Sequence, residues 1–332
     1  MKKILIIQTA FIGDVILATP LVEKLKRFYP SSEIDFLLRK GNEGLLKNHP
    51  KINEILIWDK KKSKYNSLAK LGRVVRKNRY DILINLQRFA SSGLLTTSSK
   101  AKVKIGFTKN PFSFAYTHKF PHIVDENMHE VQRNLSLIEH LTDGAFQRPV
   151  LYPSKNDYRK IRPLQNGGYF CIAPASVWFT KQFPKEKWVE LIDRLNPDFN
   201  IYLIGAPNDL DLCDAIAKET IHGKVKILAG ELSFLQSAAL MEGAKMNYVN
   251  DSAPLHLASA VNAPTAAVFC STIPQFGFGP LSDNSHLIET SEKLECRPCG
   301  LHGKKSCPKG HFKCATMIDV NEMVNIGKAK SK

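Results

Sequence analysis

The apolar positions of the chain follow two periods that alternate from end to end. Short segments such as residues 4–8 are apolar almost throughout, as are strands that are buried on both faces of a parallel sheet. Longer segments such as residues 15–28 carry apolar side chains three and four positions apart, which predicts helices. The repeated alternation of the two patterns predicts an α/β fold with parallel sheets.

Two such series are separated by a segment of different composition. Residues 147–168 are rich in Pro, Lys, Asn and Gly and lack a sustained period, so we expect domains at 1–155 and 156–332. The expected architecture is two Rossmann-like domains that face each other across a cleft. Strands are predicted at 4–8, 34–38, 55–58, 82–86, 103–107, 169–173, 201–204, 225–228, 246–249 and 265–269. Helices are predicted at 15–28, near 44, and at 67–77, 129–141, 185–195, 208–219, 233–243 and 254–261.

The composition of the 332 residues narrows the class of protein. No run of about 18 consecutive apolar residues is present, so we expect no transmembrane helix. The apolar run after Met1 ends at Ile7 and is too short for a signal peptide. The seven cysteines are spread along the chain, unlike those of a secreted disulfide scaffold. We therefore expect a cytoplasmic protein.

The net charge of +16 is concentrated in the first half of the chain. Residues 1–150 hold 26 basic and 13 acidic side chains, whereas residues 151–332 hold 21 and 18. Between Lys60 and Lys104, thirteen basic residues accompany one acidic residue, Asp81. Such a stretch is either the solvated face of a helix or a surface for an anionic partner.

Ligands of open parallel sheets bind beyond the carboxyl ends of the strands, so the loops after the strands are the candidates for chemistry. The first of these loops places Gly13 and Asp14 ahead of a helix. Asp14 is either a helix cap or a general base that accepts a hydroxyl proton. A second loop, residues 173–184, carries Lys181, which is either a solvated lysine or a group that neutralises a phosphate.

A third loop, residues 249–260, follows a buried strand and enters a helix almost at once. In the functional interpretation, the backbone N–H groups of Ser252 and Ala253 and the helix dipole form a diphosphate site. In the alternative, Asp251 only caps the helix and His256 is a core histidine. The small residues of this loop let a ligand approach the backbone, which favours the functional interpretation.

Three motifs in this order resemble glycosyltransferase family 9, the ADP-heptose:lipopolysaccharide heptosyltransferases. They are Phe-Ile-Gly-Asp at 11–14, Lys-Gln-Phe-Pro at 181–184, and Asn-Asp-Ser at 250–252 with His256. The resemblance covers nearly the whole chain, and residues 250–282 are most similar to the heptosyltransferase II branch. The chain departs from the family at Ala253, where Gly is frequent, at Pro254, and at Gln182 and Phe183.

The resemblance implies a GT-B fold, with the acceptor on the first domain and ADP-heptose on the second. It implies an inverting transfer of heptose to the lipopolysaccharide inner core, with Asp14 as general base and Lys181 stabilising the departing diphosphate. This scheme requires no cofactor. The donor-binding residues that the resemblance implies are Gly13, Ser176, Thr180, Lys181, Asp209, Leu232, Asp251, Ser252, Ala253 and His256.

The same resemblance gives the basic half of the chain a partner. Arg88 and Lys109 are candidates for the acceptor side because of their loop positions. The stretch from Lys60 to Lys104 is then expected to meet the phosphorylated lipid A and core acceptor and the anionic inner leaflet. This predicts a protein that is peripheral at the cytoplasmic face of the inner membrane.

Four of the cysteines, Cys296, Cys299, Cys307 and Cys314, cluster near the end of the chain. Four thiolates can close a tetrahedral structural zinc site, and the first pair has the spacing of a zinc knuckle. The second pair is spaced more widely than is usual, so reduced or disulfide-linked cysteines are the other interpretation. A comparable segment occurs in relatives of the heptosyltransferase II type.

Two other functions stay open from the sequence. One is a GT-B enzyme that uses another nucleotide sugar, or an epimerase on the same scaffold. The other is a nucleic-acid-binding protein, which the sequence pI of about 9.5 and the cysteines suggest. The basic residues are not accompanied by a recognised nucleic-acid motif, so we expect no nucleic-acid partner.

Overall fold

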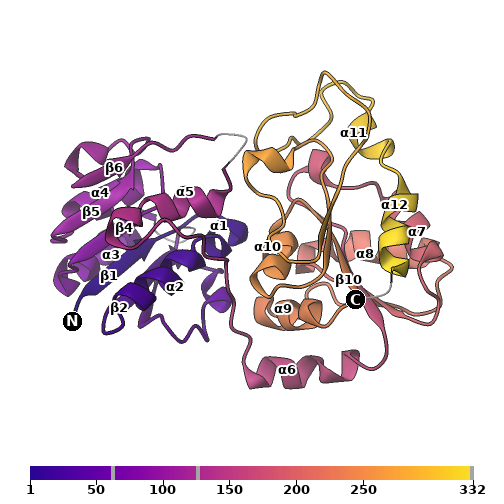
Figure 1. Ribbon diagram of the computed structural model, residues 1–332, viewed down its shortest axis with the longest axis horizontal. Helices are drawn as coiled ribbons and strands as arrows, with labels where there is room; N and C mark the ends of the chain where they lie inside the picture. The colour runs from indigo at the N-terminus through magenta and orange to yellow at the C-terminus, as the bar shows by residue number, and fades with distance from the viewer. Residues whose placement is uncertain (61–63, 125–127, 330–332) are drawn as a thin grey trace. The chain divides into compact units, whose positions relative to one another are not determined.

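The computed structural model describes residues 1–60, 64–124 and 128–329. The chain divides into two compact units, Met1–Tyr152 and Pro153–Lys332, and each unit is built around its own parallel sheet (Figure 1). The predicted boundary between residues 155 and 156 falls at the start of helix α6 (Lys155–Ile161). Within the described ranges, no helix has the length and apolar character needed to cross a bilayer.

The first unit has a six-stranded sheet in the order β3-β2-β1-β4-β5-β6, with every neighbouring pair parallel. Its strands are β1 (Lys3–Ile7), β2 (Glu33–Arg39), β3 (Glu54–Trp58), β4 (Ile82–Asn85), β5 (Val103–Phe107) and β6 (His118–Phe120). Its helices are α1 (Ile12–Ile16), α2 (Thr19–Phe28), α3 (Lys64–Asn78), α4 (Ala90–Ser98) and α5 (Glu130–Ser136). Strand β1 is the central strand, and its residues from Ile4 to Ile7 are fully buried, as its apolar run predicts.

The second unit repeats this plan in the order β12-β11-β10-β7-β8-β9, again with every pair parallel. Its strands are β7 (Tyr169–Ala173), β8 (Asn200–Leu203), β9 (Val225–Ile227), β10 (Met246–Asn250), β11 (Thr265–Val268) and β12 (Ser285–Ile288). Its other helices are α7 (Lys185–Arg194), α8 (Leu210–Glu219), α9 (Phe234–Glu242), α10 (Ala253–Ala260), α11 (Lys313–Thr316) and α12 (Val320–Lys328).

Counted along each unit, the two sheets have the same strand order, 3-2-1-4-5-6. The first strand of each unit therefore lies between the second and the fourth, and the chain reverses its direction across the sheet at that point. Ligands of doubly wound sheets bind at this switch point, beyond the carboxyl ends of the strands. The loops that matter are those after β1 and β4 in the first unit and after β7 and β10 in the second.

Three of the predicted elements differ in the structure. In place of the single helix expected at 15–28, the structure has two helices, α1 and α2. The first helix ends with Leu17 as its C-cap, and the second begins at Thr19 with Pro20 in its first turn. The helix expected at 129–141 ends at Ser136 and is followed by a 3₁₀ turn. The helix expected near residue 44 is also only a 3₁₀ turn.

The pattern also missed several short or amphipathic elements. Helix α6 lies in the segment expected to be irregular, and it begins where the Ser154 hydroxyl accepts a hydrogen bond from the Asp157 N–H at 3.2 Å. Strands β6 and β12 lie at the edges of their sheets, where few apolar side chains are required. Helix α12 lies beside α7 and buries Met323 and Val324 in the core of the second unit (Figure 1).

Candidate functional site

Asp14 lies directly after the central strand of the first unit, at the third position of α1. Its Oδ2 accepts a hydrogen bond from the backbone N–H of Phe11 at 3.0 Å, so it does cap the helix. Asp14 is largely but not fully buried. A capping bond to one oxygen leaves the other oxygen of the carboxylate available for a further interaction.

The surroundings of Asp14 favour the protonated form of its carboxyl group. Burial raises the pKa of Asp14 to about 6, and the negative charge of Glu130 adds to this shift. Hydrogen bonds from backbone N–H groups and the positive charge of Arg39 act in the opposite direction. A carboxylate with a pKa near 6 is ionised at neutral pH and is a stronger base than an ordinary aspartate, which suits a general base.

Arg39 and Glu130 come from distant parts of the first unit, and sequence reasoning missed both of them. The Arg39 guanidinium lies 4.8 Å from the centre of the Phe11 ring, which holds it near the Asp14 loop. Glu130 begins α5, and its carboxylate accepts a hydrogen bond from Arg133 Nε at 2.7 Å. Neither residue lies in a sequence motif that would point to Asp14. They influence the pKa of Asp14 because the fold brings the end of β2 and the start of α5 near it.

In the second unit, the structure brings together two residues predicted from different loops. Lys181 follows β7 and Asp251 follows β10, and Lys181 Nζ lies 2.8 Å from Asp251 Oδ2. The two side chains are 14% and 7% exposed. The hydroxyl of Thr272 donates to the same Asp251 oxygen at 2.6 Å. Sequence reasoning missed Thr272, which lies beyond β11, the neighbour of β10 in the sheet.

Asn250 fixes the loop that carries Lys181. Its side-chain oxygen accepts a hydrogen bond from the Phe183 N–H at 3.0 Å, and its side-chain nitrogen donates to the Pro174 carbonyl at 2.7 Å. One buried amide thus ties both ends of the loop between β7 and α7 to the end of β10. In the Asn-Asp pair predicted from the sequence, Asn250 therefore fixes the loop between β7 and α7, and Asp251 forms the ion pair with Lys181.

Helix α10 starts immediately beside this ion pair. Ser252 is its N-cap residue in extended conformation, Ala253 is its first residue, and Pro254 occupies the second position. The first N–H groups of an α-helix have no acceptor within the helix and carry its positive dipole end. His256 is buried on the same helix, with its ring centre 6.4 Å from that of Phe278. This arrangement is suited to an anion such as a diphosphate.

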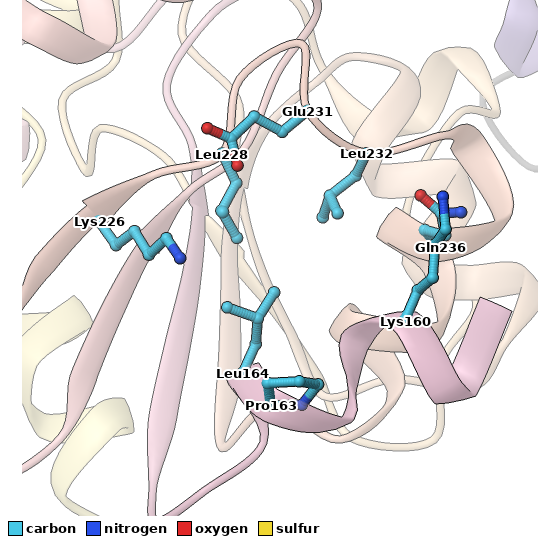
Figure 2. A pocket seen from close by; sticks show the side chains of 8 residues that line it. All are labelled: Lys160, Pro163, Leu164, Lys226, Leu228, Glu231, Leu232 and Gln236. Carbon is cyan, nitrogen blue, oxygen red and sulfur yellow. The ribbon is translucent and has the colours of Figure 1, made fainter.

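Leu232 lines a cavity of about 310 Å³ in the second unit. Figure 2 shows the side chains of Leu232, Leu164 and Leu228 around its centre. Lys160, Pro163, Lys226, Glu231 and Gln236 complete the lining. The cavity is bounded by α6, the end of β9 and the start of α9. Its lining combines apolar side chains with polar and charged ones.

The remaining predicted donor residues lie in the expected loops, and their roles stay predictions. Asp209 Oδ2 accepts a hydrogen bond from the Ala206 N–H at 2.7 Å, at the start of α8. Ser176 accepts one through its carbonyl from Gln182 Nε2 at 2.6 Å. Gly13 is the second residue of α1, and Thr180 is buried next to Lys181.

Arg88 and Lys109 follow β4 and β5 and are exposed, on the same edge of the first sheet as Asp14. Asn110 Nδ2 donates to the Gln87 carbonyl at 2.8 Å and to the Phe89 carbonyl at 3.1 Å, which joins the two loops. Within the basic stretch from Lys60 to Lys104, residues 61–63 lie outside the described residues. The basic side chains of α3 from residue 70 onward are exposed.

The four clustered cysteines are reduced in this structure. Cys296 Sγ lies 3.8 Å from His311 Nε2. Burial raises the pKa of the Cys314 thiol to about 11, and the charges of the neighbouring cysteines add to this. Across residues 1–60, 64–124 and 128–329, no three or more His, Cys, Asp or Glu side chains are grouped as metal ligands are.

Comparison with known proteins places this architecture in a family. The profile described as "Glycosyltransferase family 9 (heptosyltransferase)" matches residues 68–309. The lipopolysaccharide heptosyltransferase 3 of Escherichia coli is 31% identical over 82% of this chain and 85% of its own length. The lipopolysaccharide heptosyltransferase 1 of Campylobacter coli is 26% identical over 98% of both chains. Relatives named heptosyltransferase 1, 2 and 3 all match, so these comparisons single out no branch.

Solved structures confirm the fold. A family 9 glycosyltransferase from Veillonella parvula superimposes with a TM-score of 0.84 at 21% identity, covering 98% of this chain and 96% of its own. The ADP-heptose lipopolysaccharide heptosyltransferase II of Escherichia coli superimposes with a TM-score of 0.77 at 20% identity, covering 99% and 100%. The predicted GT-B fold is therefore correct. The chain belongs to glycosyltransferase family 9 and is a glycosyltransferase.

Proposed function

We propose that this protein transfers a heptose from ADP-heptose to the inner core of a lipopolysaccharide precursor, with inversion at the anomeric carbon. Family membership gives the class of reaction. An Escherichia coli heptosyltransferase of the same fold has been solved with ADP-2-deoxy-2-fluoro heptose, which supports this donor. The observation that carries the proposal is the buried Lys181–Asp251 pair beside the start of α10.

The reaction is a single displacement. Asp14 accepts the proton of the acceptor hydroxyl, whose oxygen forms a bond to the anomeric carbon while the bond from that carbon to the diphosphate oxygen breaks. ADP leaves with the electron pair. Lys181 and the N–H groups of Ser252 and Ala253 stabilise the negative charge that develops on the diphosphate. Every step is assigned to groups of this chain, so the scheme uses no cofactor.

The other donor contacts follow from their places in the second unit. The cavity beneath Leu232 takes the adenine ring, and Asp209, after the neighbouring strand β8, binds the ribose hydroxyls. His256 lies one turn into α10, next to the diphosphate. Gly13 and Ser176 let the donor approach the backbone at the ends of β1 and β7.

The acceptor is an anionic lipid, and the first unit has the surface for it. Arg88 and Lys109 bind the phosphorylated core or lipid A, and the exposed basic side chains of α3 contact the anionic inner leaflet. Each basic residue near such a surface contributes about 1 kcal/mol. We therefore propose that the protein acts in the cytoplasm, peripheral at the inner face of the inner membrane.

For the four cysteines we propose that they stay reduced and hold no metal, which is one of the two interpretations that their spacing allows. Zinc analysis of protein purified without a chelator tests this assignment. Stoichiometric zinc would contradict it and would return the four thiolates to the structural role that their spacing first suggested.

The central test is an assay of donor choice. The purified protein is incubated with ADP-heptose or with UDP-glucose, together with a deacylated core acceptor, and the product is identified by mass spectrometry and NMR. We expect transfer from ADP-heptose and an anomeric configuration opposite to that of the donor. Transfer from UDP-glucose alone would contradict the donor, and a retained configuration would contradict the single displacement. Salt-sensitive RNA binding without transfer would favour a nucleic-acid-binding protein.

A further inference from the structure

The segment that contains the four cysteines, residues 296–314, is bonded to the loop that carries Lys181. We call it the Cys-rich segment. Thr180 donates its backbone N–H to the Lys304 carbonyl at 3.1 Å, and Lys304 donates its own N–H to the Thr180 hydroxyl at 2.8 Å. Two reciprocal hydrogen bonds therefore join the residue before Lys181 to this segment.

The backbone N–H, the carbonyl and both hydroxyl lone pairs of Thr180 make structural contacts, so the O–H proton is the group left for a further partner. The Ser271 hydroxyl donates to the Thr180 hydroxyl at 2.9 Å, and the Ser271 N–H donates to the Thr180 carbonyl at 3.2 Å. A hydroxyl oxygen has two lone pairs, and here both are used, by Ser271 and by Lys304. The residue is also 1% exposed, which leaves little surface for a ligand.

The Cys-rich segment also lies against the side chain of Lys181 itself. Gly303 has a φ of +75°, and a Cβ at this position would lie 2.8 Å from Lys181 Cγ and 3.2 Å from Lys181 Cδ. The backbone at Gly303 therefore lies directly against the apolar stem of the lysine. A side chain at this position would clash with that stem and would also strain the left-handed backbone.

A second set of contacts reaches the partner of Lys181. The Arg297 guanidinium donates to the backbone carbonyls of Phe269, Cys270 and Thr272, at 3.1, 2.8 and 2.9 Å. Thr272 is the residue whose hydroxyl donates to Asp251. The Cys-rich segment is thus bonded to both loops that surround the Lys181–Asp251 pair.

We propose that the Cys-rich segment positions Lys181, and that Thr180 acts as a positioning residue rather than as a contact to the donor. This inference rests on the proposed function, in which Lys181 stabilises the diphosphate. It follows from two kinds of contact made by adjacent residues of the segment, the hydrogen bonds of Lys304 to Thr180 and the packing of Gly303 against the Lys181 stem. It replaces the sequence-based role of Thr180 as a donor-binding residue.

The test compares Thr180→Val, which keeps the shape and removes the hydroxyl, with Thr180→Ser, which keeps the hydroxyl. We expect Thr180→Val to raise the KM for ADP-heptose and the Kd for ADP about 10-fold, because a misplaced Lys181 loses its phosphate contact. Thr180→Ser should restore both constants to within about 2-fold. Thr265→Val is the matched control, since it removes another buried hydroxyl of the same unit, bonded to the Ala263 carbonyl.

Gly303→Ala places a Cβ against the Lys181 stem and keeps the test open if Thr180→Val does not fold. It should weaken ADP binding to a similar degree while keeping the Thr180 hydroxyl, which would lie 3.2 Å from the new Cβ. Wild-type ADP binding in both folded variants would overturn the positioning role.

A double-mutant cycle with Lys181→Ala separates positioning from direct contact. If Thr180 acts through Lys181, then Thr180→Val should add almost nothing to the defect of Lys181→Ala. Fully additive effects would overturn the inference, because they would mean that Thr180 binds the donor independently. If Lys181→Ala alone leaves ADP binding and turnover unchanged, the proposed function fails instead.

Discussion

The two units of this protein share one strand order but place opposite charges at the same topological position. In the first unit, the central strand β1 leads to a carboxylate, Asp14, whose environment raises its pKa. In the second unit, the central strand β7 leads to an ammonium group, Lys181, which is paired with Asp251 from the end of β10. The fold therefore fixes where chemistry is placed, and the residues after the strand decide which chemistry it is.

The two groups are also held in different ways. Asp14 is fixed mainly by its own helix, through the bond from Phe11, and its basicity comes from burial and from Glu130. Lys181 is held by an ion pair with Asp251 and by contacts of the Cys-rich segment. A base must exchange a proton in every turnover, whereas a cation that stabilises a leaving group works best when it is preorganised.

The largest expected effect comes from removing the base. Asp14→Asn keeps the size and the capping oxygen but cannot accept a proton, so kcat should fall about 10²- to 10⁴-fold. The Kd for ADP should not change, because Asp14 lies in the first unit and the proposed diphosphate and adenine sites lie in the second. Stopped assays with ADP-heptose and titration calorimetry with ADP measure the two quantities. Turnover at the wild-type rate would remove Asp14 from the mechanism.

The second effect comes from removing the cation. Lys181→Ala should lower kcat about 10²- to 10³-fold, the usual effect of losing one group that stabilises developing charge, and should weaken ADP binding as well. Lys181→Arg is the control that keeps the positive charge, and it should recover part of the turnover and part of the ADP affinity. If Lys181→Ala bound ADP as tightly as the wild type, this would contradict the proposed role of the second unit in binding the diphosphate through Lys181.

The same two variants should change stability in opposite directions. The pKa of Asp14 is raised from 3.8 to about 6 in the folded state, so its contribution to stability falls between these two pH values and the full cost remains above them. Asp14→Asn should therefore raise Tm at pH 7.5. Lys181→Ala leaves the buried carboxylate of Asp251 without its cation and should lower Tm. Thermal unfolding followed by circular dichroism measures both. Shifts of the same sign would contradict the comparison.

Sequence reasoning found these residues because parallel strands leave a strong local pattern. A short apolar run, then Gly-Asp or Asn-Asp-Ser, then a helical period, marks the carboxyl end of a buried strand, and Asp14, Lys181 and Asp251 all follow such runs. The family resemblance then gave them roles. Their local placement in the structure agrees with the predicted loops.

The residues that tune the site could not be found in this way. Arg39, Glu130 and Thr272 act through contacts that arise only when separate elements pack together, and none of them lies in a recognised motif. The Cys-rich segment was interpreted through its cysteines, whereas its main contacts to Lys181 come from Gly303 and Lys304. Its irregular backbone has no period from which these contacts could be predicted.

A smaller effect concerns the pH dependence that the first unit should impose. Asp14 must be ionised to act, so kcat/KM should rise with pH through about 6 and level off above it. The positive charge of Arg39 lowers the pKa of Asp14, so Arg39→Met should move the rise of kcat/KM, the acidic limb of the profile, to higher pH. Arg39→Lys should leave this limb near the wild-type position. Profiles at constant ionic strength measure the shift. An unchanged limb in Arg39→Met would contradict the coupling.

The smallest effect on the soluble reaction is expected from the charge difference between the units. Replacing four exposed basic residues of α3 by Gln should leave turnover of a deacylated acceptor within about 2-fold. It should reduce binding to phosphatidylglycerol vesicles about 10³-fold, since the four residues contribute about 1 kcal/mol each. Four exposed basic residues of the second unit form the control, which should bind as the wild type does. If both variants lost the same vesicle affinity, the binding would depend on the net charge of the protein and not on the surface of α3. The two sets are Lys70, Arg73, Arg76 and Lys77, and Lys155, Arg159, Arg162 and Lys224.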